Sequence, residues 1–470
     1  MKHSYVLNNF TFYDRSGISE YLEKKAEEGW MLEKTGSVFW RFAKIEPKHI
    51  NFAVTYFPSA SEFDPAPSEN QLRFRDFCEH TGWHHIADSA QMQIYCNESE
   101  DPVPIETDAL IEVETIHKCV KKTYLPGYWV IFGIGIFMLL LGIFMLFDNP
   151  VDTLSSPSGP GMFLLGLCEA AMGASELILY YNWYRKAKKA AEESGTFVRT
   201  RDCRWLRWLI CTVMLMILAV MFSSLLQSRD YSFHVGRLLL LLFVMLLPIP
   251  LAVYAAKGIM KKLGVSAKVN QRVTAIVLVL LWNASILGNT LSVFEEFSQG
   301  KHLRDGIETY EYNGSTFYIY HDELPLYLED LTDTADIEYS TKAAVSSTPF
   351  VSRSEYFQRP RLDSSDRTSL EYTVVDVKLP VLFDMCLEDI LGEGNTFKFD
   401  DYGNSFIYEY AEIDPAEWNA DRAYQLKKVY TKVYSHDYIL VYGNRIVNFK
   451  PDFHPDSQMK ETIAEKLGEK

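Results

Sequence analysis

The sequence predicts a membrane protein in which a five-helix transmembrane bundle lies between an α+β cytoplasmic domain and an α+β extracytoplasmic domain. Three observations support this fold class. Long apolar segments are confined to the middle of the chain, the residues before and after them are polar and acidic, and basic residues gather in alternate loops. The predicted boundaries are residues 1–117 for the amino-terminal domain, 118–297 for the transmembrane region and 298–470 for the carboxy-terminal domain.

Each apolar segment is long enough to cross a bilayer as a helix. The first, Pro126–Phe147, contains 22 residues and no charge. A helix of that length extends about 33 Å, whereas the hydrocarbon core of a bilayer is roughly 30 Å thick. The other four predicted spans are Met162–Tyr181, Trp208–Gln227, Leu238–Ala256 and Val273–Phe294.

The charge of the loops predicts the orientation of the chain. The loops before the first span, between the second and third, and between the fourth and fifth hold 16 Lys and Arg residues, whereas the two alternate loops hold 2. Basic loops remain in the cytoplasm. We therefore expect a multi-pass protein of the cell membrane with a cytoplasmic amino terminus and an extracytoplasmic carboxy terminus. The start of the chain lacks the apolar stretch of a cleavable signal peptide.

Composition and motifs limit the range of functions that the sequence supports. Residues 1–117 carry a net charge of −10 and residues 298–470 a net charge of −14. Because nucleic acids bind basic surfaces, DNA and RNA are not expected partners, whereas the lipid bilayer is. The sequence contains no CxxC pair, Walker A loop, HExxH motif or GxSxG motif. We therefore predict no enzymatic activity, no catalytic residues, no metal and no cofactor.

The amino-terminal domain contains a duplication. A helix predicted at Ile18–Gly29 ends in glycine and is followed by Trp30, and 53 residues later a helix at Leu72–Gly82 is followed by Trp83. An opening strand at Ser4–Phe12 would complete an antiparallel sheet that carries both helices. The two tryptophans are interpreted as core residues between helix and sheet, or alternatively as a pair that stacks on a ligand. The strands expected after the helices are Gly36–Phe42, Ile50–Phe57, His84–Ala87 and Gln91–Cys96.

A family resemblance rests on the same residues. The segment EYLEKKAEEGWMLEK, followed by the aromatic strand WRFAK, resembles the amino-terminal module of bacterial domain-of-unknown-function family 2812. The resemblance is strongest over residues 1 to about 120. It implies a membrane protein of Firmicutes whose gene lies near PadR-type transcriptional regulators, and it implies no catalytic residue.

The second predicted span carries two glutamates on a side rich in small residues. Glu169 and Glu176 are seven residues apart, which places them about 20° apart around a helix axis, and Gly166 and Gly173 share their side. Small residues allow another helix to approach closely, so this side should face the bundle. An ionisable residue within a membrane is a candidate functional position. The expected hydrogen-bonding partners, on the fifth span, are Asn283 and Asn289.

The carboxy-terminal domain is predicted to be α+β. Hairpins are expected around Asn313-Gly314 and Gly443-Asn444, because glycine and asparagine favour tight turns between strands. A strand is expected at Leu370–Lys378. The expected helices are Pro380–Leu391, Ala420–Tyr430 and Asp456–Leu467.

Two functions are compatible with this architecture. The first is a non-enzymatic membrane protein that senses or relays a signal across the bacterial membrane, with a membrane protein or a transcriptional-regulator pathway as its partner. The alternative is a proton- or ion-coupled transporter, or a subunit of one, that uses Glu169 and Glu176. Alternatively, the only role of both glutamates could be to form hydrogen bonds between helices.

Overall fold

A computed structural model describes the chain except for residues 1, 37, 201–202, 228–247, 299–307, 333–336, 365–366, 395–396, 400–404, 430–432 and 469–470. Only the backbone is described at 222, 224–227, 248, 285–298, 397–399 and 405–406. The chain divides into two compact units. The first contains the residues up to Ile136, Gly166–Met216 and helices α9 (Pro248–Lys262) and α10 (Ala267–Ser298). The second contains Phe137–Leu165 and the carboxy-terminal sheet.

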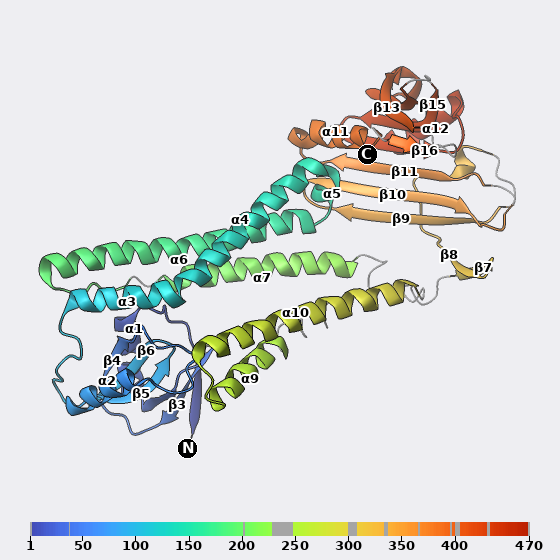
Figure 1. Cartoon of the computed structure of the whole chain (residues 1–470). Helices are drawn as coiled ribbons and strands as arrows, with labels where there is room; N and C mark the ends of the chain where they lie inside the picture. The colour runs from blue at the N-terminus through green and yellow to red at the C-terminus, as the bar shows by residue number, and fades with distance from the viewer. Residues whose placement is uncertain are drawn as a thin grey trace. The chain divides into compact units, whose positions relative to one another are not determined.

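Two βαββ repeats begin the first unit (Figure 1). The first repeat consists of β1 (His3–Leu7), α1 (Arg15–Glu27), β2 (Trp30–Lys34) and β3 (Phe39–Lys44). The second consists of β4 (Asn51–Tyr56), α2 (Glu69–His80), β5 (His84–Ser89) and β6 (Met92–Asn97). The strand orders are β1-β3-β2 in the first sheet and β4-β6-β5 in the second. We refer to these repeats, together with α3 (Ala109–Thr123), as the amino-terminal module.

The prediction of a single sheet in this region is wrong. Each repeat completes its own three-stranded antiparallel sheet, and the strand expected at Ile50–Phe57 opens the second repeat as β4. Gly29 and Gly82 end the two helices with the same φ of +83°, a left-handed conformation that glycine adopts without steric cost. The sequence pattern of helix, glycine and tryptophan therefore marks the centre of each repeat and does not mark its start.

Helix α1 lies between the two sheets. Its sequence places Ile18, Leu22 and Ala26 on one side at helical spacing, and all three are buried. The helix contacts both β2 and β4. Trp40 and Phe42 of the first sheet belong to the same core. The two repeats are thus joined by one hydrophobic core, which also takes in α3 and the carboxy-terminal half of α6 (Ser158–Ser194).

Three helices are long and apolar enough to cross a membrane, counted within the part of the chain that the structure describes. They are α4 (Leu125–Asp148), α6 and the segment Arg204–Met221 of α7 (Arg204–Gln227). The short helix α5 (Pro150–Ser155) connects α4 and α6. Most of the predicted fourth span lies outside the described residues, and the predicted fifth span lies within α10.

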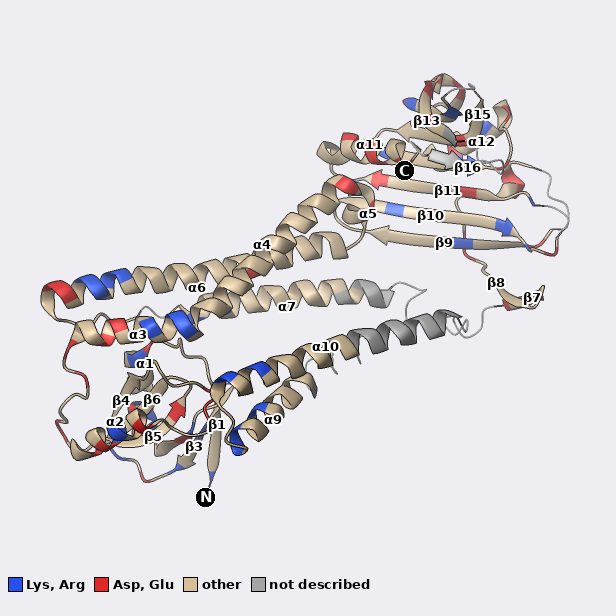
Figure 2. Ribbon diagram, viewed as in Figure 1, with Lys and Arg blue, Asp and Glu red and all other residues tan. Residues whose placement is uncertain are grey.

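Basic residues lie near the ends of several helices in the first unit, as Figure 2 shows for α3, α6, α9 and α10. Lys121 and Lys122 occupy the last turn of α3, and Lys261 and Lys262 the last turn of α9. Two contacts join α9 and α10 to the module. Lys257 Nζ lies 2.6 Å from a carboxylate oxygen of Glu62, and the buried Asn270 amide donates to the Phe63 carbonyl at 3.0 Å.

The second unit is built on an eight-stranded antiparallel sheet with the order β12-β13-β14-β15-β16-β11-β10-β9. Both predicted hairpins are present, and one of them, β7–β8, forms a separate two-stranded sheet. The strands are β7 (Glu308–Tyr312), β8 (Ser315–Ile319), β9 (Tyr339–Ser347), β10 (Val351–Pro360), β11 (Leu370–Val377), β12 (Phe397–Phe399), β13 (Ser405–Ile413), β14 (Arg422–Lys428), β15 (Tyr434–Tyr442) and β16 (Arg445–Pro451). The helices are α11 (Phe383–Glu393), α12 (Ser457–Gly468) and the 3₁₀ turns Leu328–Asp330, Pro380–Leu382 and Pro415–Trp418.

The helix predicted at Ala420–Tyr430 is wrong, because this segment forms strand β14. The buried side chains Ala423 and Leu426 are three residues apart, which is a helical spacing. The two side chains lie on opposite faces of the strand, and both faces are covered: Ala423 belongs to the core around Trp418, whereas Tyr424, on the face of Leu426, packs against the core around Ile390. A strand that is buried on both faces lacks the two-residue alternation, so its buried residues can show a helical spacing.

Candidate functional site

A buried carboxylate, Glu176, joins three parts of the first unit. Its side chain is 5% exposed, and its Oε1 lies 3.1 Å from Nε of Arg207, at the start of α7. Its Oε2 accepts a hydrogen bond of 2.7 Å from the hydroxyl of Tyr124, the residue that precedes α4. Arg207 Nη2 also donates to Thr11 Oγ1 of the module at 3.1 Å. We call these four residues the Glu176 cluster.

Aromatic rings surround this cluster. Tyr13 packs edge to face on Tyr124, with ring centroids 5.7 Å apart, and on Tyr180 of α6 at 5.0 Å. Burial, and then the nearby Glu176 carboxylate, raise the pKa of the Tyr13 hydroxyl. The Tyr180 hydroxyl lies 2.6 Å from Nδ1 of His117 in α3. The charged pair is therefore shielded from water, and in a low-dielectric setting it interacts strongly.

The small-residue side of α6 contacts α4 closely. A Cβ atom at Gly173 would lie 2.7 Å from the backbone nitrogen of Phe132 in α4. A Cβ atom at Gly135 in α4 would lie 2.8 Å from Cα of Ala170 in α6. Both distances are too short for a real side chain, so the two glycines permit the approach of the helices. The composition of this stripe predicts such a contact.

The structure does not bring together all the intramembrane residues that the sequence suggests. Glu176 contacts Tyr124 and Arg207, and the expectation that Asn283 pairs with it is wrong: the Asn283 amide is exposed and donates to the Val279 carbonyl of its own helix at 2.8 Å. Asn289 has no described side chain. Glu169 is half-buried, and its Oε2 has no hydrogen-bond partner among the described residues.

The two tryptophans of the repeats lie in different clusters. Trp30 is half-buried against the core around α1, and Lys44 Nζ lies 4.8 Å from its ring centroid. Trp83 is buried with Cys78 and Tyr95 under α2, and its Nε1 donates to the Val103 carbonyl at 2.8 Å. These contacts favour the interpretation of both rings as packing residues.

Reasoning from the sequence missed the partners of Glu176. In the sequence, Arg207 is one of the basic residues next to the membrane. It lies at the start of an apolar segment, four residues after Cys203. Thr11 lies in the connection between β1 and α1, which has no periodic pattern. Contacts between segments 31 to about 200 residues apart leave no local signal, so only the carboxylate could be found.

A second group of buried charges lies inside the module. Arg15, the first residue of α1, pairs with Glu112 of α3, and Glu106 lies close enough to both to interact electrostatically. Burial raises the pKa of each of these carboxyl groups from 4.5 to about 7, although Arg15 acts in the opposite direction. The sequence did offer a signal for Glu112, because it shares the apolar side of α3 with Ile116 and Cys119.

The raised pKa values predict a pH-dependent stability. The folded protein binds these protons more tightly than the unfolded chain, so their stabilising contribution is complete below about pH 4.5 and is lost as the pH rises through about 7. Glu106→Gln should therefore raise the free energy of unfolding by at most about 3 kcal/mol at pH 8 and by less than about 1 kcal/mol at pH 5. Thermal unfolding at both pH values measures the difference.

The control for this prediction is Glu100→Gln, which removes an exposed carboxylate from the same connection between β6 and α3. At both pH values it should leave the free energy of unfolding within about 0.5 kcal/mol of that of the wild-type chain. An equal effect of Glu106→Gln at pH 5 and pH 8 would contradict the assignment.

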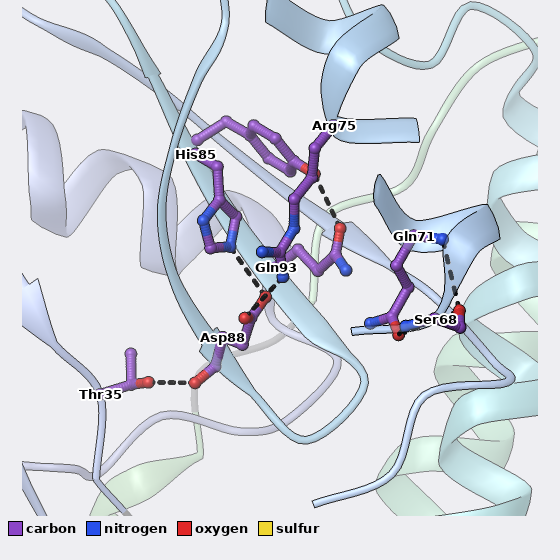
Figure 3. A network of polar contacts seen from close by, with 8 residues as sticks. Thr35, Ser68, Gln71, Arg75, His85, Asp88 and Gln93 are labelled. Carbon is purple, nitrogen blue, oxygen red and sulfur yellow. Dashed lines mark hydrogen bonds and ion pairs between the residues drawn. The ribbon is translucent and has the colours of Figure 1, made fainter. Parts of the chain in front are cut away.

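A polar network ties the second repeat to the first (Figure 3). Arg75 of α2 and His85 of β5 both contact Asp88, at 2.7 and 2.8 Å, and Thr35 donates to the Asp88 carbonyl. Burial favours the neutral carboxyl group, yet His85 and Arg75 together hold the pKa of Asp88 below its ordinary value. Nearby, Gln93 accepts a hydrogen bond of 2.7 Å from the Tyr95 hydroxyl. These contacts fix the edge of β5 against the end of β2.

In the second unit, the α5 segment is bound to the sheet. The backbone N–H of Val151 donates to the Asp389 carboxylate of α11 at 3.0 Å, and Asp152 pairs with Arg353 of β10. The carbonyls of Leu154 and Ser155 accept hydrogen bonds from hydroxyl groups on the β9–β10 hairpin, that of Ser155 from Ser346 at 2.9 Å. Helix α5 is therefore held along its whole length.

An acidic cavity of about 690 Å³ lies beside this attachment. Four carboxylates from α11 and the end of α4 give it a negative potential, which would attract a cation. Burial raises the pKa of one of them, Asp389, while its hydrogen bond from Val151 acts in the opposite direction. The lining residues are Phe147, Asp148, Asn149, Pro150, Met385, Glu388, Asp389, Gly392 and Glu393.

The fold and the polar clusters define a duplicated βαββ module joined to helices that are suited to a membrane. Residues 14–127 match the family described as protein of unknown function (DUF2812), which supports assigning this module to that domain family. The match begins at the N-cap of α1 and ends in the first turn of α4. Comparison with curated proteins and with solved structures gives no match.

Proposed function

We propose that this chain is a multi-pass protein of the bacterial membrane that relays a signal between an extracytoplasmic domain, residues 298–470, and the cytoplasmic amino-terminal module. In this proposal five helices cross the bilayer. The basic ends of α3 and α9 support a cytoplasmic module, because basic residues are retained on that side. The partner is a membrane protein or a component of a transcriptional-regulator pathway.

One observation carries the proposal: the segment α5–α6 is held by polar contacts in both units. In the second unit, Asp389 and Arg353 bind α5. In the first unit, Glu176 and Tyr180 of α6 contact Arg207 and His117. Helix α6 is continuous from Ser158 to Ser194, so a displacement of α5 can be transmitted along it. A rigid secondary-structure element that links two sites can carry such coupling.

Proton-coupled transport is the second candidate, and Glu169 is the observation that favours it. Its Oε2 is buried, and no described residue donates to it. A carboxylate of this kind can carry a proton. Glu176 fits this function less well, because Arg207 neutralises its charge.

Proton flux separates the two functions. The full chain, reconstituted in liposomes that contain a pH-sensitive dye, is compared with the Glu169→Gln variant and with the Glu169→Gln/Glu176→Gln variant. The relay proposal predicts the same proton flux for all three and for empty liposomes. A flux that requires the wild-type chain and is abolished by Glu169→Gln would contradict the relay and favour transport.

A further inference from the structure

One face of the first sheet is uncovered by the described chain. Along this face, Tyr5 is 65% exposed and Phe39 is 54% exposed, and Leu7 is exposed beside them. Leu7 and Phe39 are paired across β1 and β3, so their side chains lie on the same face. The opposite face, which bears Trp40 and Phe42, is buried against α1. Exposed contiguous apolar side chains of this kind mark interaction surfaces.

In the second repeat, the sheet face that corresponds to this open face is covered. The pair Leu7–Phe39 corresponds to the pair Tyr56–Met92 of β4 and β6, because β3 and β6 are 53 residues apart in register. Tyr56 and Met92 are both buried in the core that contains α1. In the second sheet, therefore, this face is closed by a helix from the preceding repeat.

The covering helix α1 has a counterpart in α2. Tyr21 of α1 packs on Phe42 with ring centroids 6.4 Å apart, and Phe74, 53 residues later in α2, packs on Tyr95 at 6.3 Å. Each helix thus sits in the same way on its own sheet. Helix α1 also contacts the second sheet, because the Glu23 carboxylate accepts a hydrogen bond from the Phe52 backbone N–H at 3.4 Å.

The side of α2 that corresponds to the Glu23 side of α1 is not covered by any part of the described chain. Asp76 stands at the position of Glu23 and is exposed, as is Glu79. On this side Leu72, one turn before Asp76, is 49% exposed. Phe77 lies about 100° further around the helix axis from Asp76 and is 58% exposed, so α2 carries an exposed leucine among acidic residues with an exposed ring on the adjoining side.

The two uncovered surfaces are complementary in charge. Lys2, Lys34 and Arg41 surround the open face of the first sheet, where Glu33 is the acidic residue paired with Arg41 at 2.9 Å. The exposed side of α2 carries Asp76 and Glu79, and its exposed Arg73 is paired with Glu69. We propose that a second copy of this chain docks its α2 on the open face of the first sheet, so that Leu72, with Phe77 at the edge of the contact, covers Tyr5, Leu7 and Phe39.

This contact joins two different surfaces, so it is heterologous and can extend beyond a dimer. The assembly would retain one open sheet face at one end and one open α2 at the other. The expected products of crosslinking are therefore dimers together with a decreasing series of larger species.

Photocrosslinking tests the proposal in the full chain, expressed in its membrane. A photoreactive phenylalanine analogue replaces Phe39, and the same analogue at Ile111, an exposed residue of α3, is the control. The expected result is a ladder of covalent oligomers from position 39, with crosslinks to residues 69–80 identified by mass spectrometry, and no such crosslinks from position 111. Asp76→Lys combined with Glu79→Lys should reduce the yield at least fivefold, because it removes the charge complementarity.

Four results would overturn the proposal. Crosslinks confined to residues 3–7 and 39–43 of the second copy would show that two sheet faces pack on each other. Adducts with lipid alone or with another protein would show a different occupant. A monomer at high expression would show that the face stays open. An unchanged yield in the double lysine variant, confirmed as folded by its melting temperature, would exclude the α2 contact.

Discussion

Arg207→Met is expected to destabilise the first unit by about 3–5 kcal/mol, since it leaves the buried Glu176 carboxylate without a cation. The side chain of Arg207 is 19% exposed, and the partner oxygen is 3.1 Å away. Methionine retains most of the apolar part of the arginine side chain, so the loss of stability measures the contribution of the charge. The same substitution also removes the hydrogen bond to Thr11, which connects α7 to the module. Thermal unfolding of the purified chain in detergent measures the change.

The control for this prediction is Arg199→Met. Arg199 pairs with Glu20 at 2.8 Å, but both side chains are exposed, so its loss should cost less than about 1 kcal/mol. The double variant Glu176→Gln/Arg207→Met should recover part of the stability, because it leaves no uncompensated charge. Equal losses for Arg207→Met and Arg199→Met would contradict the assignment of Glu176 as a buried ionised partner.

Gly135→Ala should separate α4 from α6. The added Cβ would lie 2.8 Å from both Cα of Ala170 and the Gly166 carbonyl oxygen. These are backbone atoms, so the clash can be relieved only by moving a helix. Overpacking of this kind costs typically 1–3 kcal/mol. We expect a lower melting temperature and faster proteolysis of the full chain in detergent.

Gly133→Ala is a matched control for the helix substitution. Gly133 lies two residues earlier on α4, and a Cβ placed there would meet no atom within 4 Å. Because alanine has a higher helix propensity than glycine, this variant should be at least as stable as the wild-type chain. Destabilisation by Gly133→Ala equal to that by Gly135→Ala would mean that α4 and α6 do not pack as described.

Several features of the fold could be predicted because their signals are local. Gly82 repeats Gly29 after 53 residues, and both adopt the φ of +83° that glycine permits. Gly173 and Ala170 lie on one side of α6 at helical spacing, which indicates a close helix contact. Turn residues at Asn313-Gly314 mark a hairpin that is present.

Other features depend on contacts between distant residues and leave no pattern in the sequence. Whether the module forms one sheet or two depends on which strands pair, and β1 pairs with β3 whereas β4 pairs with β6. The partners of Glu176 lie 52 and 31 residues away, in segments that appear only as the borders of apolar helices. Strand β14 resembles a helix in sequence because both of its faces are covered, which removes the two-residue alternation.

The relay is tested most directly by hydrogen exchange in the amino-terminal module after a change in the second unit. Arg353→Met on β10 removes the partner of Asp152 in α5, and Arg359→Met, on the same strand but exposed and paired with Glu371, is its control. The full chain is measured in lipid nanodiscs. The account predicts that Arg353→Met, but not Arg359→Met, changes the exchange of backbone amides in residues 8–22 and 176–191. A change confined to residues 137–165 and 308–468 would contradict it.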